Sequence, residues 1–559
     1  MICERRDFLK IGLVGLAVIL AMRMFLSFCL FATVNEFSLF DGDSCSRILN
    51  SWEWAKNPSL QPLAGDWLNL HFWTFGLGLK IYPDTVLVPI IINNVFSLGA
   101  LIILFMLTVK LFPSNIAGGL LVSGIAAFNP FLIWLSFSGL PATIFYFLIL
   151  VGIFCWVEYI KERKTSALIF AATAFLLSTG FRYEAWIFTF IFSCFVLREG
   201  WLYFREYRIF NWSLFLSGLL VWSFVLYWLI AQKIYCGNYF YFLLYQYEAV
   251  AGEGILGGLN VIEIIMRFFV NSASPFPRVV VFGSIFGVVL AGIQMFKSKK
   301  EVSDLIIFVS LQYIVLMGGY VFRVGGPWIA KSTAITFLLL LPFCGFVVFR
   351  AIPIRNRCVQ IIIAFLLVIA FFWGNLVKDA YNPRYHLPIG GVERSDARQC
   401  GMLIRELYRS RDLKDKERVL LEQPLTGSSP NIWDGFFIRV VAPRRIIWDR
   451  GEKYICKDGQ PYLSTEDNPS KLDSSSEILS KFFKKENIRI IIAVSTQVEE
   501  KLAEIMDKVL IIGKYNFYVR KDERSLKTNI KKRNKELELE WYDKWWVSSV
   551  FQIRPFWIR

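Results

Sequence analysis

The sequence predicts an α-helical polytopic membrane protein of about eleven transmembrane helices, followed by a C-terminal extracytoplasmic α/β domain. Of its 559 residues, 55% are hydrophobic and only 19% are charged, whereas soluble domains carry roughly 25% charged residues. Long apolar segments recur up to residue 378 and then stop. Residues 379–559 hold 34 of the 61 Lys and Arg residues, so the chain divides into a membrane part and a polar part.

Eleven segments approach the ~20 apolar residues that a membrane-spanning helix needs. They are 8–32, 86–109, 116–136, 140–160, 165–181, 184–197, 212–231, 276–296, 302–322, 331–350 and 358–378. The two shortest, 165–181 and 184–197, meet at Phe181-Arg-Tyr-Glu184. The first run is too long for the core of a cleaved signal peptide, and no small-residue cleavage site follows it. We therefore expect an uncleaved first helix.

The distribution of Lys and Arg over the loops predicts the orientation. With a cytoplasmic N-terminus, the short cytoplasmic loops hold 16 basic residues and the longer opposite loops before residue 378 hold nine. Positive residues favour the cytoplasmic side, so we expect a multi-pass plasma membrane protein with residues 33–85 and the C-terminal domain outside. The net charge of +16 is spread over short loops and a tail, which argues against a nucleic-acid partner.

The connection over residues 33–85 is long enough to be structured. Its pattern predicts a helix near 44–56, a Pro/Gly turn over 58–65 and a second helix over 66–80. The second helix is apolar but too short to span, which favours an interfacial or re-entrant segment. Counting it as a span would also invert every later loop.

The polar part of the chain has the pattern of a small α/β domain over residues 379–520. Short β-type runs at 418–422, 488–493, 509–512 and 515–519 alternate with helical patterns at 395–410, 475–485 and 497–507. In the tail, residues 521–559, a charged helix precedes several tryptophans, a combination typical of interfacial anchors.

Two carboxylates, Asp41 and Asp43, follow the first apolar segment. One interpretation is structural: Asp is a favoured helix N-cap, and Asp43 with Arg47 has the spacing of a simple helical ion pair. The other is catalytic: a carboxylate at the membrane surface can act as a general base. The pair could also bind a divalent cation such as Mg or Mn through oxygen ligands. The sequence argues against a zinc site, because it has only two histidines and no CxxC motif.

These features together resemble the GT-C glycosyltransferases, which use polyprenyl-phosphate-linked sugars. The order of one long first span, an acidic motif in a long first outer loop, a series of spans and an outer C-terminal domain is the plan of protein O-mannosyltransferases, aminoarabinose transferases and oligosaccharyltransferase catalytic subunits. Asp41-Gly-Asp-Ser-Cys-Ser-Arg47 resembles the first-loop pattern Asp-x5-Arg of that family, with Asp41 at the catalytic aspartate. Many relatives have Asp-Glu where this chain has Asp-Gly-Asp. Segments 65–73, 129–139 and 181–185 are also similar to family segments, and the resemblance covers about residues 1–350.

Other polar residues near the predicted outer surface are candidate substrate-binding groups. Arg182 and Glu184 form either a neutralised pair at the membrane edge or a pair that faces substrate. Arg323, in Arg323-Val-Gly-Gly-Pro-Trp328, could bind a lipid phosphate or contact headgroups without a catalytic role. Arg47 is a candidate through its place in the Asp-x5-Arg pattern. Asp66 and His71 are weaker candidates, since a histidine among aromatic residues is more often a packed interface residue.

The resemblance implies an inverting transfer of a sugar from a polyprenyl-phosphate donor to a glycan, lipid or protein acceptor outside the membrane, with Asp41 as general base. The main alternative is a transporter or flippase of lipid-linked sugar, which predicts ionisable residues in mid-span and interrupted helices in paired positions. A polymerase or ligase with the same donor, and a non-enzymatic binding role for the outer domain, are further alternatives.

Overall fold

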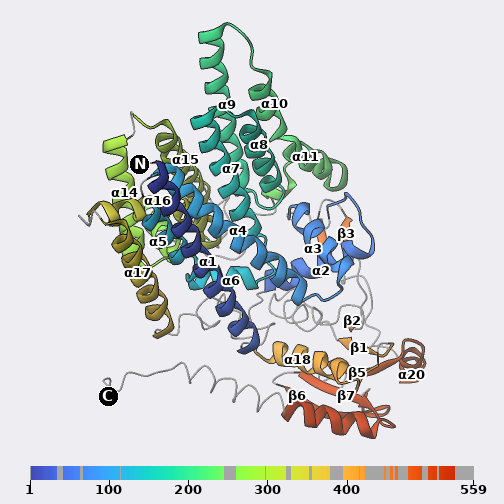
Figure 1. The fold of residues 1–559 in the computed structure, drawn as a ribbon. Coiled ribbons are helices and arrows are strands. Elements are labelled where there is room, and N and C mark those ends of the chain that lie inside the picture. The colour runs from blue at the N-terminus through green and yellow to red at the C-terminus, as the bar shows by residue number, and fades with distance from the viewer. Residues whose placement is uncertain are drawn as a thin grey trace.

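The computed structural model describes residues 2–33, 42–62, 67–113, 115–244, 260–295, 298–322, 329–351, 356–377, 395–414, 416–421, 446–448, 454–457, 460–463, 476–493, 502–512 and 515–535. Figure 1 shows a helical bundle with a sheet domain beside one of its ends. The helices of the bundle are α1 (Ile2–Thr33), α2 (Gly42–Lys56), α3 (Asn69–Ile81), α4 (Leu87–Leu111), α5 (Ile116–Ala127), α6 (Pro130–Phe137), α7 (Ala142–Glu162), α8 (Thr165–Thr179), α9 (Glu184–Tyr207), α10 (Trp212–Leu220), α11 (Ser223–Cys236), α13 (Val261–Ala273), α14 (Arg278–Met295), α15 (Lys300–Val321), α16 (Ile329–Ala351) and α17 (Arg357–Val377).

Every predicted span forms helix, and within the described residues nine helices are long and apolar enough to cross a membrane. The prediction for 116–136 is corrected: this segment is two helices, α5 and α6, bent by 58°. The bend falls at Asn129-Pro130. Proline has no N–H to continue α5, and the Asn129 side chain accepts a hydrogen bond from Leu132 N at 3.1 Å, which starts α6.

Two further segments differ in length from the prediction. The segment 184–197 continues to Tyr207 as the 24-residue helix α9, because aromatic and long charged side chains sustain the helix beyond its purely apolar part. The segment 165–181 forms the 15-residue apolar helix α8, which is shorter than a full span.

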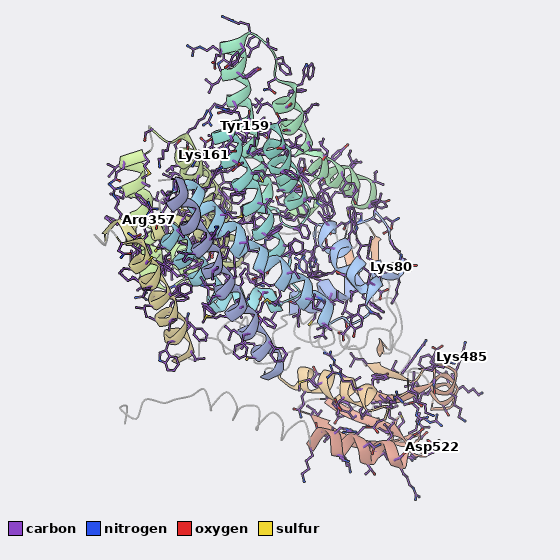
Figure 2. All side chains as sticks on the ribbon, in the orientation of Figure 1. Lys80, Tyr159, Lys161, Arg357, Lys485 and Asp522 are labelled. Carbon is purple, nitrogen blue, oxygen red and sulfur yellow. The ribbon has the colours of Figure 1, made fainter. Side chains whose placement is uncertain are left out.

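Ion pairs gather at one end of the bundle, where they join loops that the charge pattern assigned to one side of the membrane. Arg198 forms a two-point pair with Asp304 at 2.8 and 2.9 Å, and Arg163 pairs with Glu199 at 2.8 Å. Lys161 reaches Glu301 at 3.1 Å. Figure 2 shows Lys161 at the end of the bundle that lies away from the sheet domain. We call these residues the ion-pair layer.

The C-terminal domain contains a five-stranded sheet in the order β2-β1-β5-β7-β6. Its strands are β1 (Arg418–Leu421), β2 (Ile446–Trp448), β5 (Ile488–Ala493), β6 (Met506–Ile512) and β7 (Tyr515–Arg520), with α18 (Ser395–Arg409), α20 (Ser476–Lys485) and the hairpin β3 (Tyr454–Lys457) and β4 (Gln460–Leu463). β1 runs parallel to β2 and β5, whereas β7 runs antiparallel to β5 and β6. A helix over residues 524–535 also packs here, through buried Leu526 and Ile530.

The sheet domain contacts the bundle through an ion pair. Arg405 of α18 lies 3.6 Å from Asp84, and Asp84 accepts hydrogen bonds from the first backbone N–H groups of α4 at Val86 and Leu87. We call this end of the bundle the domain end. It is the end opposite the ion-pair layer, as Figure 2 shows by the positions of Asp522 and Lys161.

Helices α2 and α3 form the predicted structure in the first long connection. They pack very closely at Gly76, where a Cβ atom would lie 2.4 Å from the Trp54 ring and 2.9 Å from Ser51 O. The segment between them is held by Trp54, whose Nε1 donates to Ser59 O, and by Asn69, whose Nδ2 donates to Gln61 O, both at 2.8 Å. These contacts hold α2 against α3 and fix the segment that connects them.

Candidate active site

Four helices of the bundle begin at one place at the domain end. The first turns of α2, α9 and α16 contribute Asp43, Glu184 and Lys331, and the second turn of α7 contributes Tyr146. Three of the residues predicted from the sequence, Asp43, Arg182 and Glu184, are thereby brought into one cluster. Because helix N-termini carry partial positive charge, this arrangement favours an anionic group.

Asp43 and Lys331 face one another in this cluster. Lys331 Nζ lies 3.9 Å from Asp43 Oδ2 and 5.5 Å from the centre of the Trp134 ring. The Lys331 side chain is 8% exposed and that of Asp43 is 35% exposed, so the carboxylate is the accessible partner. Lys331 was not among the site residues predicted from the sequence. A signal was available, since this lysine lies at the start of an apolar span, three residues after the Trp of Gly-Gly-Pro-Trp.

Arg182 and Glu184 form a two-point ion pair beside Lys331, with side chains that are 16% and 14% exposed. Arg182 Nε and one terminal nitrogen donate to the Glu184 carboxylate at 3.0 and 2.6 Å, and the same terminal nitrogen reaches Ser332 Oγ at 3.2 Å. Burial disfavours the charged guanidinium. The Glu184 carboxylate nevertheless outweighs it and, with smaller contributions from Tyr146 and Asp43, raises the pKa of Arg182. Arg182 is therefore a permanent cation, oriented in a fixed plane.

Tyr146 connects α7 to α16. Its hydroxyl donates to the backbone carbonyl of Lys331 at 2.6 Å, and both residues are buried. Because the acceptor is the backbone of Lys331 itself, this bond holds the start of α16 and, with it, the cation that faces Asp43.

Arg47 and His71 lie on the α2–α3 side of the cluster. The Arg47 guanidinium stacks on Trp67, with Cζ 4.0 Å from the ring centre. His71 has no exposed surface, and its Nε2 lies 3.2 Å from Gly139 O. A carbonyl can only accept, so Nε2 carries the proton. Burial and, second, the positive charge of Arg47 hold the pKa of His71 well below its ordinary value of 6.5, so the ring is neutral.

Three predicted site residues, Asp41, Asp66 and Arg323, lie outside the described residues. Within the part of the chain that the structure describes, no group of three or more His, Cys, Asp or Glu side chains could hold a metal ion. Among the described residues, Lys331 and Arg182 are two cations near Asp43.

No protein-family model and no curated protein sequence matches the chain, but solved structures do. The crystal structure of ArnT from Cupriavidus metallidurans bound to undecaprenyl phosphate superimposes with a TM-score of 0.55 at 9% identity, over 92% of this chain and 98% of ArnT. The oligosaccharyltransferase of Archaeoglobus fulgidus in its apo form gives a TM-score of 0.48 at 14% identity, over 86% of this chain and 69% of that protein.

The same archaeal oligosaccharyltransferase tethered with an acceptor peptide has 13% identity and a TM-score of 0.44, and the chain covers 81% of its own length and 65% of that protein. The chain thus spans about two thirds of the oligosaccharyltransferase but nearly the whole of ArnT. At these identities the likeness concerns the fold, and only the match to ArnT exceeds a TM-score of 0.5 among these three. This chain therefore shares the fold of ArnT.

Proposed function

We propose that this chain is a membrane glycosyltransferase that moves a sugar from a polyprenyl-phosphate donor to an extracytoplasmic acceptor. The observation that carries the proposal is the cluster at the domain end, in which Asp43 meets Lys331 and Arg182. It provides cations for the departing phosphate and, in Asp43, a carboxylate that can orient the acceptor next to the proposed base Asp41. The fold adds support, since ArnT binds undecaprenyl phosphate.

In the proposed step, an acceptor hydroxyl oxygen attacks the anomeric carbon of the donor sugar. The bond from that carbon to the phosphate oxygen breaks, and its electron pair leaves on the polyprenyl phosphate. The hydroxyl proton passes to Asp41 as general base. Attack on the face opposite the leaving group inverts the anomeric configuration.

The cations would act on the leaving group, because negative charge grows on the phosphate as the bond breaks. Lys331 is held on the Trp134 ring and Arg182 is held in plane by Glu184, so neither must reorganise during the reaction. Arg323 was predicted for this role from the sequence, and we now propose Lys331 for it as well. Asp43 would then balance Lys331 and orient the acceptor.

A divalent cation such as Mg or Mn, bound by Asp41 and Asp43, would act as a Lewis acid at the phosphate. The described surroundings of Asp43 provide cations rather than a third carboxylate ligand. We therefore propose that Lys331 and Arg182 compensate the negative charge of the leaving phosphate.

The orientation follows from the charge pattern. We propose that the ion-pair layer lies at the cytoplasmic face of the plasma membrane and the domain end outside it, where polyprenyl-phosphate sugars replace nucleotide sugars as donors. The acceptor would be a glycan, lipid or protein. A flippase of lipid-linked sugar predicted interrupted helices in paired positions, whereas the described residues contain one bent pair, α5–α6.

The test uses membranes containing the full chain and a panel of undecaprenyl phosphates that carry radiolabelled hexoses and pentoses. We expect label to move from undecaprenyl phosphate to a second lipid, a glycan or a protein with one of these donors, as thin-layer chromatography and gel electrophoresis would show. We expect Asp41→Asn to lower the rate by about 10²- to 10⁴-fold, the range for loss of a general base. Asp522→Asn, in the sheet domain, is the matched control. Normal transfer by Asp41→Asn would overturn the assignment of the base.

A further inference from the structure

The turn between α6 and α7, residues 138–141, is held by an unusual set of side chains. Three of its backbone carbonyls in succession accept hydrogen bonds from side chains: Asn93 Nδ2 donates to Ser138 O and, at 3.1 Å, to Leu140 O, and His71 Nε2 donates to Gly139 O at 3.2 Å. Asn93 and His71 are both fully buried. Carbonyls at a helix end need such partners when water is excluded, so the turn is held rigidly from α3 and α4.

Helix α2 rests directly on this turn. A Cβ atom at Gly139 would lie 2.5 Å from Ile48 Cδ1 and 3.1 Å from the backbone carbonyl of Ser44. Ser44 and Ile48 are themselves fully buried, so α2 and the turn lie in contact with no gap between them. Ser44 follows Asp43, and the height of α2 above the turn therefore sets the position of the Asp43 carboxylate.

The same turn also controls the partner of Asp43. It leads into α7, whose Tyr146 hydroxyl donates to Lys331 O at 2.6 Å. Asp43 on one side and Lys331 on the other are thus both positioned from one short segment. His71, Asn93 and Gly139 are neither the proposed base nor proposed phosphate cations, so the proposed reaction gives them no role.

We propose that the turn over residues 138–141 is the positioning element of the site, and that His71, Asn93 and Gly139 are positioning residues that set Asp43 relative to Lys331. This inference rests on the proposed function. Because His71 is buried without exposed surface, its role would be to hold the turn and not to touch substrate. A neutral ring is the form that suits this role, since a buried imidazolium would need a second partner for Nδ1, which has none among the described residues.

The first test adds one methyl group at the contact. Gly139→Ala must push α2 away by some tenths of an ångström, and small misplacements of reacting groups cost up to about 10²-fold in rate. We expect kcat to fall about 10- to 100-fold, while the affinity for undecaprenyl phosphate changes less than about threefold. Gly200→Ala is the matched control, because nothing lies within 4 Å of the added atom.

The second test separates a positioning role from a general structural role. Gln places its amide nitrogen near the Nε2 position of histidine, whereas Asn is too short to reach Gly139 O. We expect His71→Asn to lose rate as Gly139→Ala does, and His71→Gln to recover most of that loss. Equal loss in both His71 variants would overturn the role of the Nε2 bond. The His71 pair also decides the question if Gly139→Ala does not fold.

A third measurement keeps the inference separate from the proposed function. Amide hydrogen exchange over residues 43–48 should be faster in Gly139→Ala and His71→Asn than in Gly200→Ala and His71→Gln, in detergent and without substrate. This result would support the positioning of α2 even if no donor in the panel reacts, in which case the transferase proposal alone fails. Unchanged exchange in Gly139→Ala, with or without loss of rate, would overturn the inference.

Discussion

Lys331 Nζ lies 3.9 Å from Asp43 Oδ2, although Lys331 begins a late span and Asp43 begins a helix in the first long connection. The pair is asymmetric, since the lysine is nearly buried and the aspartate is accessible. A nearly buried cation beside an accessible carboxylate can serve an incoming anion without first losing a water shell. This relationship makes Lys331 the described residue from which binding of a lipid phosphate is best tested.

We expect Lys331→Met to weaken binding of undecaprenyl phosphate about tenfold, equivalent to about 1.4 kcal/mol, because it removes the charge and keeps the aliphatic stem. Binding is measured by the ligand-dependent rise in melting temperature of the purified protein. Lys80→Met, at an exposed lysine of α3, is the control. Equal affinity in the two variants would contradict a phosphate role for Lys331.

The Arg182–Glu184 pair should behave as a unit. Removing one partner of a fully buried ion pair costs about 3–5 kcal/mol, which is an upper bound for this pair because its side chains are 16% and 14% exposed. We expect Glu184→Gln to lower the melting temperature strongly and the double variant Arg182→Met/Glu184→Met to lower it less, as a thermal unfolding series would show. We expect the double variant to lack transferase activity even though it is more stable than Glu184→Gln. Additive destabilisation would mean that the two side chains are independent.

The ion-pair layer should support stability and not chemistry. Asp304 is fully buried between Arg198 and Trp156 Nε1, which donates to it at 3.1 Å. We expect Asp304→Asn to destabilise the protein by about 3–5 kcal/mol and to leave the pH and substrate dependence of transfer unchanged. Glu206→Gln, at an exposed glutamate of the same protein end, is the control for thermal unfolding. A selective loss of kcat without loss of stability would contradict this division.

His71 predicts a pH dependence of stability. Its pKa in the folded protein lies well below the ordinary value of 6.5, so the unfolded chain binds more protons between these two values. Stability therefore falls as pH drops below about 6.5, with a slope of up to about 1.4 kcal/mol per pH unit. We expect His71→Gln to flatten this part of a plot of melting temperature against pH. An identical slope in both proteins would contradict a neutral buried His71.

Much of the architecture follows from local patterns. The apolar segments up to residue 378 all form helices, and the α2–α3 pair forms in the first long connection. The bend at Asn129-Pro130 was missed, although proline inside an apolar run is a local signal. These features are predictable because burial in lipid and backbone hydrogen bonding act on each segment by itself.

Tertiary structure decided which helix ends meet. Asp43, Arg182 and Glu184 were candidates by residue type and location, but their meeting with Lys331 and Tyr146 depends on how four separate helix starts pack together. The support of that cluster by His71, Asn93 and Gly139 is equally remote in sequence. Hydropathy determines that a segment crosses the membrane and which side its loops favour. Only side-chain packing between helices determines which ends lie within a few ångströms of one another, and the proposed chemistry depends on that packing.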